Sequence, residues 1–158
     1  APEWRLEGGW VLVEHPRRRA AFLYLFDTAH PPRLLTGLTT TAQTVSLAWP
    51  MRAVAPGDAA EFALGMTAGE CCGAAAAGAW VGGRIARPGG GVRCAVLGCL
   101  PEGTARFTLG DAAVEAPLRT VFLPGVGAVA AAQADFPAGA PAQPLRIAAA
   151  GIAQREAA

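Results

Sequence analysis

The sequence predicts an all-β protein, an antiparallel β-sandwich of jelly-roll type with about ten short strands. Short stretches rich in Val, Leu, Phe, Trp and Thr recur along the chain, and several alternate between apolar and polar residues. Alternation of this kind is typical of strands with one buried face. Clusters of Pro, Gly and Asp separate the stretches at the spacing of antiparallel strands, and convincing helical periodicity is scarce.

The expected strands follow one another between these turns. Apolar and polar or small residues alternate in 44–49, 61–66, 106–109 and 145–147. Two Ala-rich segments, Gly69–Gly78 and Gly127–Ala134, are also compatible with short helices, although glycines in or beside them weaken that alternative. The predicted strands are Trp10–Glu14, Ala20–Phe26, Thr44–Trp49, Ala60–Met66, Trp80–Ala86, Val92–Leu97, Ala105–Leu109, Leu118–Leu123, Ala128–Phe136 and Pro144–Ile152.

The turns and the length point to one domain. A chain of 158 residues fits a single domain, and no internal repeat or Ser/Gly linker divides it. We therefore predict one β-sandwich domain over residues 1–158, with its tails, 1–7 and 148–158, held by contacts that a neighbouring subunit could supply. The turn signals are Pro31-Pro32, Pro56-Gly57-Asp58, Pro88-Gly89-Gly90-Gly91, Pro101-Glu102-Gly103, Gly110-Asp111 and Pro124-Gly125.

Composition excludes several chemistries. The chain has no Lys and no Asn, which removes Schiff-base catalysis, a P-loop and N-glycosylation sequons. Its single serine, Ser46, lies in an alternating strand pattern instead of a Gly-flanked nucleophile elbow. The acidic residues are scattered, and His15 and His30 each precede a proline. We therefore predict a protein without enzymatic activity and without a cofactor.

Charge and hydropathy bear on the partners. A net charge of +1 argues against nucleic acid, because phosphate binding needs a concentrated basic face. The single basic run, Arg17-Arg18-Arg19, is either a solvated turn or a contact for an anion or acidic glycan. No unbroken apolar window is long enough to predict a membrane-spanning helix.

The four cysteines leave two interpretations open. Cys71, Cys72, Cys94 and Cys99 could form two disulfides, which would indicate an oxidising compartment, or remain as buried thiols. A metal site is disfavoured, because adjacent cysteines on an extended chain point to opposite faces and the C-x2-C spacing of structural zinc sites is missing.

Trp80 and Arg84 are the predicted ligand-binding residues. Small residues surround Trp80 in the sequence Gly78-Ala79-Trp80-Val81-Gly82, which suggests an accessible ring. A tryptophan on a sheet can stack on a sugar while a nearby arginine donates hydrogen bonds. The alternative to this site is a Trp80 ring that fills the core.

Low charge (16%) and high apolar content (53%), with no catalytic constellation, favour a structural protein whose apolar surface is covered by neighbours. We expect a homo-oligomeric subunit of a larger assembly, such as a virion, phage tail, fibre, spike or surface appendage. It would be located outside the cell or on a particle surface, and could contribute to host attachment. The alternative is a carbohydrate-binding module of jelly-roll type.

Overall fold

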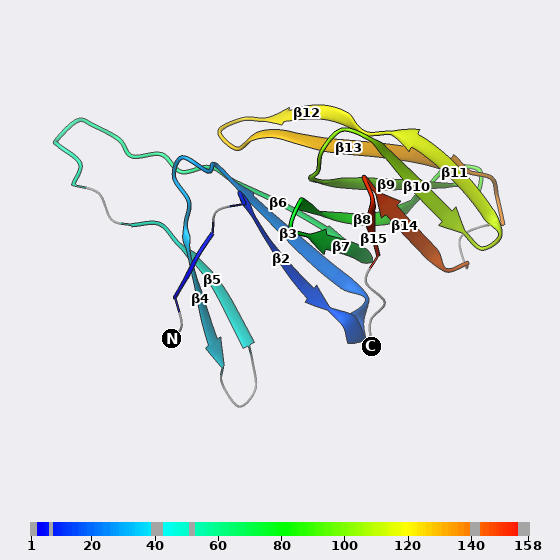
Figure 1. Ribbon diagram of the computed structural model, residues 1–158, viewed down its shortest axis with the longest axis horizontal. Helices are drawn as coiled ribbons and strands as arrows, with labels where there is room; N and C mark the ends of the chain where they lie inside the picture. Colours follow the sequence, from blue (N-terminus) through cyan, green and yellow to red (C-terminus); the bar gives the residue numbers. More distant parts are fainter. Residues whose placement is uncertain (1–2, 7, 39–42, 51–52, 140–142, 155–158) are drawn as a thin grey trace.

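The computed structural model describes residues 3–6, 8–38, 43–50, 53–139 and 143–154. These residues form strands and one turn of 3-10 helix, with no α-helix among them, and every paired strand is antiparallel to its neighbour (Figure 1). The elements are β1 (Glu3–Arg5), β2 (Trp10–His15), η1 (Pro16–Arg18), β3 (Ala20–Phe26), β4 (Arg33–Leu38), β5 (Gln43–Ala48), β6 (Leu64–Gly69), β7 (Cys71–Ala75), β8 (Gly78–Ala86), β9 (Val92–Cys99), β10 (Thr104–Leu109), β11 (Ala112–Pro117), β12 (Arg119–Leu123), β13 (Gly127–Phe136), β14 (Leu145–Ala149) and β15 (Ile152–Ala153).

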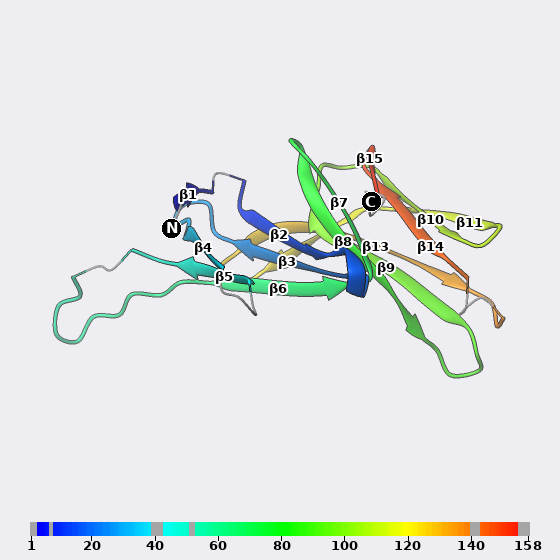
Figure 2. The ribbon, with the colours of Figure 1, turned by 90° about the horizontal axis from the view of Figure 1, so that it is seen from below.

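The strands form four sheets in the described part of the chain. A central sheet has the order β12-β13-β9-β8-β7, and a second has the order β11-β10-β14-β15. Two three-stranded sheets have the orders β2-β3-β6 and β1-β4-β5. Figures 1 and 2 show β2, β3 and β6 on one side of β8, and β10, β11 and β14 on the other.

One face of the central sheet packs against β10 and β14. Even-numbered residues of β8, β9 and β13 point to this side, because residues two apart on a strand share a face. Trp80, Cys94 and Phe136 are buried there together with Phe107 and Ile147 from the opposing sheet. This is the larger of the two core clusters.

The other face of the central sheet packs against β2 and β3. The odd-numbered Val81 and Val129 are buried there against Leu23 and Leu25 of β3. The chain passes from the β2-β3-β6 sheet to the central sheet between strands β6 and β7. They are separated only by Glu70, whose backbone N–H donates to the Gly82 carbonyl oxygen at 3.0 Å.

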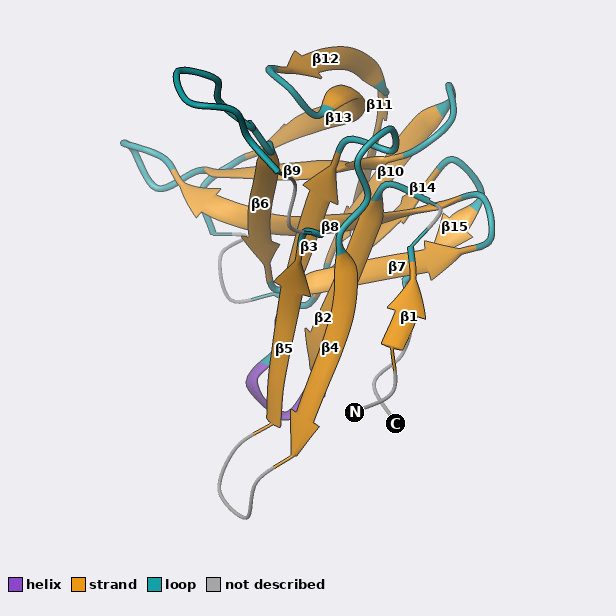
Figure 3. Cartoon of the chain, turned by 90° about the vertical axis from the view of Figure 1, so that its left-hand side faces the viewer, coloured by secondary structure: helices purple, strands orange, loops and turns teal. Residues whose placement is uncertain are grey.

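The β1-β4-β5 sheet, which we call the arm sheet, projects from the rest of the molecule (Figure 1), and Figure 3 shows β4 and β5 in front of β2 and β3. Leu34 pairs with Leu47 and Thr36 with Val45, so these four residues share one face. None of them is buried, and Val45 is 37% exposed. The arm sheet therefore has an apolar face without a core beneath it.

The all-β prediction is confirmed, and so are many strand positions, such as Ala20–Phe26. The segments Gly69–Gly78 and Gly127–Ala134 fold as strands and not as helices. The prediction missed β1, β4, β7 and β11, and placed β6 too early. The jelly-roll arrangement is not confirmed, because the strands form four sheets joined mainly between sequence neighbours. The tail residues 1–2 and 155–158 lie outside the described part of the chain.

Candidate functional site

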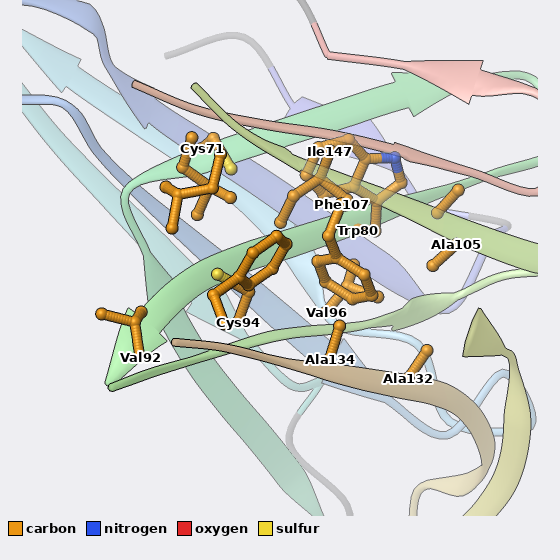
Figure 4. Close-up of a cluster of buried hydrophobic side chains, with 14 of the residues drawn as sticks. Cys71, Trp80, Val92, Cys94, Val96, Ala105, Phe107, Ala132, Ala134 and Ile147 are labelled. Atoms are coloured by element: carbon orange, nitrogen blue, oxygen red, sulfur yellow. The ribbon is translucent and has the colours of Figure 1, made fainter. Parts of the chain in front are cut away.

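Trp80 lies inside the larger core cluster and not at a binding surface. Its side chain is 0% exposed, and the indole Nε1 donates a hydrogen bond to the Ile152 carbonyl oxygen at 3.1 Å. Figure 4 shows the ring among Phe107, Ile147 and Ala105. A fully buried ring has no face to offer a sugar, so the expectation of an accessible Trp80 is wrong.

The small residues around Trp80 explain this correction. A Cβ added at Gly73 would lie 2.6 Å from Trp80 Nε1, and one added at Gly98 would lie 2.8 Å from Trp80 Cβ. Small residues next to a tryptophan therefore provide the space in which the ring is buried, instead of leaving it open to solvent. The sequence alone does not distinguish these two outcomes.

Arg84 joins three segments of the chain. Its Nε donates to Glu70 Oε1 at 2.7 Å, and its Nη1 donates to the Gln143 carbonyl oxygen at 2.6 Å. The side chain is 22% exposed. The guanidinium thus links β8 to the junction of β6 and β7 and to the segment before β14, while Trp80 is buried. The two residues do not form an open sugar site.

The cysteines are distributed over both faces of the central sheet. Cys71 and Cys94 belong to the larger core cluster, whereas Cys72 and Cys99 lie on the face that packs against β2 and β3. In each same-face pair, β8 runs between the two cysteine strands. Two ladder steps of about 4.8 Å place their Cα atoms beyond the limit of about 7 Å for a disulfide. All four are free thiols in the structure, and neither same-face pair is placed to form a disulfide.

The environment of three of these thiols makes them weak nucleophiles. Burial raises the pKa of Cys71 to about 12 and that of Cys94 to about 11. Burial also raises the pKa of Cys99. A raised pKa keeps the thiolate, which is the nucleophilic and metal-binding form, scarce at neutral pH. Within the described residues no group of three or more His, Cys, Asp or Glu is placed to hold a metal ion.

Two surface carboxylates are held by neighbouring hydrogen-bond donors. Arg93 donates to both oxygens of Asp135, at 2.8 and 3.0 Å, and Arg87 approaches the same carboxylate at 2.9 Å. These contacts, the Arg93 hydrogen bonds first, lower the pKa of Asp135. The backbone N–H of Ala29, with His30 beside it, lowers the pKa of Asp27. Both carboxylates are stabilised in the ionised form, which is unsuited to a general acid.

The first of two hollows is a groove of about 910 Å³ between β6 and β12. Strands β8, β9 and β13 contribute its floor. The lining is mainly small and apolar, so the groove can accept an apolar group or an extended chain. Its lining includes Thr67, Gly69, Val81, Gly83, Ala95, Leu97, Arg119, Val121, Ala131 and Gln133.

The second hollow is more polar than the first and has a volume of about 570 Å³. We call it the basic cleft. It lies where the β2–β3 turn, the β6–β7 junction, β10 and β14 meet, so it is assembled from segments far apart in the sequence. The sequence signal that could have found it is the Arg17-Arg18-Arg19 run, of which Arg19 alone reaches the lining. The charged residues of the cleft are Arg19, Arg84, Arg106, Arg146, Glu14 and Glu70.

We compared the chain with known protein families, curated proteins and solved structures. No protein-family model matches the chain, and no match was found among curated proteins or solved structures. In the described residues, no helix has the length and apolar character needed to cross a membrane.

Proposed function

We propose that the chain is a structural subunit of a larger homo-oligomeric assembly, in which neighbouring copies cover each other's apolar surface. The observation that carries this proposal is the outer face of the β2-β3-β6 sheet, meaning the face that points away from the central sheet. The register of the three strands assigns to this face Val11, Val13, Phe22, Tyr24, Phe26, Leu64, Met66 and Ala68.

This outer face is apolar and partly uncovered. Met66 is 64% exposed and Leu64 is 47% exposed, while Phe22 and Tyr24 are half-buried. Val11 and Phe26 are already buried within the chain, so the uncovered part of this face is centred on β6. The alternation in β6 has the opposite sense to the usual one, because Gly65 and Thr67 point inward while the larger apolar residues point to solvent. Strands that are apolar on both faces, as β3 is, are typical of sheets covered on both sides.

The arm sheet of a second copy is the occupant that fits this face. Within β4 and β5 the only charged residue is Arg33, at the first position of β4. On the apolar face of the arm sheet Val45 is exposed, and Leu34 and Leu47 are only half-buried. Small sheets need such packing for stability. Burying two uncharged surfaces against each other avoids the desolvation cost of charged groups.

We include in this proposal the sandwich arrangement and the extracellular or particle-surface location that the sequence predicts. The packed layers would serve as a rigid β-sandwich body, and the arm sheet would link one body to the next. A virion, phage tail, fibre, spike or surface appendage, outside the cell or on a particle, is the setting in which such a subunit would function. Contribution to host attachment remains part of the same proposal.

The test is molar mass by light scattering after size exclusion, over a range of protein concentrations. We compare the wild type with Met66→Asp and with the matched control Ile85→Asp, whose side chain is equally exposed (65%) but lies on β8. We expect an oligomer for the wild type and the control, and a smaller species for Met66→Asp. Val45→Asp in the arm sheet should have the same effect as Met66→Asp.

Two results would contradict the proposal. One is a wild-type mass of a single chain at every concentration. The other is a mass that falls equally for Met66→Asp and Ile85→Asp, since that would indicate non-specific association. Far-UV circular dichroism of each variant shows whether the fold is retained, which is expected for substitutions at exposed positions.

A further inference from the structure

We propose that the basic cleft binds an oxyanion: a sulfate, phosphate or carboxylate group of a small ligand. Four arginines and two glutamates line the cleft, so its formal charge is 4 − 2 = +2. The chain as a whole carries +1, which means that positive charge is concentrated at this point. The proposal is independent of the assembly function.

The arginines of the cleft differ in their partners. Arg84 is paired with Glu70, and Arg106 approaches Glu115 at 3.4 Å on an exposed surface. Arg19 and Arg146 form no ion pair with any described residue, although both line the cleft. Because an exposed pair at 3.4 Å is weak, Arg106 can also turn toward a ligand.

The register of β10 and β14 places three donors together. Thr108 pairs directly with Arg146, and Arg106 lies two residues from Thr108 on the same face of the sheet. Directly paired side chains have Cβ atoms about 5 Å apart, and diagonal neighbours are about 7 Å apart. One oxyanion can therefore reach both guanidinium groups and the threonine hydroxyl.

Arg19 approaches the cleft from the opposite sheet. It follows η1 directly and has a φ of 48°, a left-handed conformation that is uncommon for a residue other than glycine. It lines the cleft with Glu14 and His15 of β2, facing β10 and β14. Glu14 is the one lining carboxylate without a described ion pair. The negative charge of Glu14 would repel a second anionic group on the ligand, so a ligand with a single oxyanion fits best.

The volume of the cleft indicates that the oxyanion is carried by a larger molecule. A space of about 570 Å³ lies within the range of small-molecule sites and exceeds what one sulfate or phosphate fills. The remaining lining includes Ala20, Ala148 and Ala153, which are small and leave room for the rest of a ligand such as an acidic sugar.

Isothermal titration calorimetry on the full chain tests this site. The probes are sodium sulfate, sodium phosphate, N-acetylglucosamine 6-sulfate and, as a neutral match, N-acetylglucosamine, all at one ionic strength. We compare the wild type with Arg146→Ala, Arg19→Ala and the control Arg119→Ala, an exposed arginine on β12 outside the cleft. Loss of one charged hydrogen-bond donor should weaken binding about tenfold.

We expect saturable binding of sulfate or phosphate to the wild type and the Arg119→Ala control, weakened in the other two variants. Tighter binding of the sulfated sugar than of free sulfate would show that the carrier is also recognised, and equal binding would show that the oxyanion alone is. The proposal is overturned if no anion binds, or if Arg119→Ala weakens binding as much as Arg146→Ala does.

Discussion

Substitution of Trp80 by alanine tests whether this residue belongs to the core or to a binding surface. The side chain is 0% exposed and donates a hydrogen bond to the Ile152 carbonyl oxygen. Removing a fully buried tryptophan side chain costs about 3–5 kcal/mol, including the cavity left behind. Domains have about 5–15 kcal/mol of total stability, so Trp80→Ala would be a large loss.

The assay is urea unfolding together with thermal melting. For a domain of this size each kcal/mol corresponds to about 2–4 °C, so the midpoint should fall by roughly 6–20 °C. Trp80→Phe serves as the graded variant, because it keeps most of the ring but leaves the Ile152 carbonyl oxygen without its donor. It should cost about 1–3 kcal/mol.

A surface role for Trp80 predicts a different result. Substitutions of exposed residues usually change stability by less than about 0.5 kcal/mol, which corresponds to a shift in melting temperature of about 1–2 °C. A Trp80→Ala protein whose midpoint stays this close to that of the wild type would refute the packing described for β8. It would also remove the objection that burial raises against the sugar-stacking role predicted from the sequence.

Two further predictions concern the central sheet and its thiols. Gly98→Ala would drive a methyl group into the Ala79 carbonyl oxygen, so it should lower the free energy of unfolding in urea by about 1–3 kcal/mol. The control Gly83→Ala should be close to neutral, because the nearest atoms to its added methyl group lie at 3.6 Å. Equal effects of the two substitutions would contradict the packing. The raised pKa values of Cys71 (about 12) and Cys94 (about 11) mean that the folded state holds these protons more tightly than the unfolded state does. The free energy of unfolding should therefore fall as the pH rises from about 9 toward 12, with a shallower fall in Cys71→Ala, and a rise over this range would contradict the burial of the thiols.

Local patterns predicted the strands that carry strong signals. The run Ala20–Phe26 is rich in β-forming residues and folds as β3 with the predicted bounds. Pro88-Gly89-Gly90-Gly91 forms the turn between β8 and β9, where Gly89 and Gly90 have φ of 89° and 86°. Ala-rich β7 and β11 were missed or left ambiguous, because alanine has little strand preference and neighbouring strands decide its conformation.

The functional residues were harder to predict than the strands. Trp80 and Arg84 share a face of β8, as their spacing implies. That face is not open to solvent at Trp80, because it packs against β10 and β14. The basic cleft was not predicted as a site, since its arginines come from separate turns and strands. A single residue of the sequence motif, Arg19, takes part in it.

The sequence by itself determined the all-β class, most turns and the low overall charge. The class and the turns depend on backbone preferences and on the period-two pattern, which act between residues close in the chain. Only the tertiary structure decided which apolar face is covered. It buried Trp80 and left Met66 exposed, because burial depends on which distant strands supply the opposing layer, and that information is not carried by either residue's own segment.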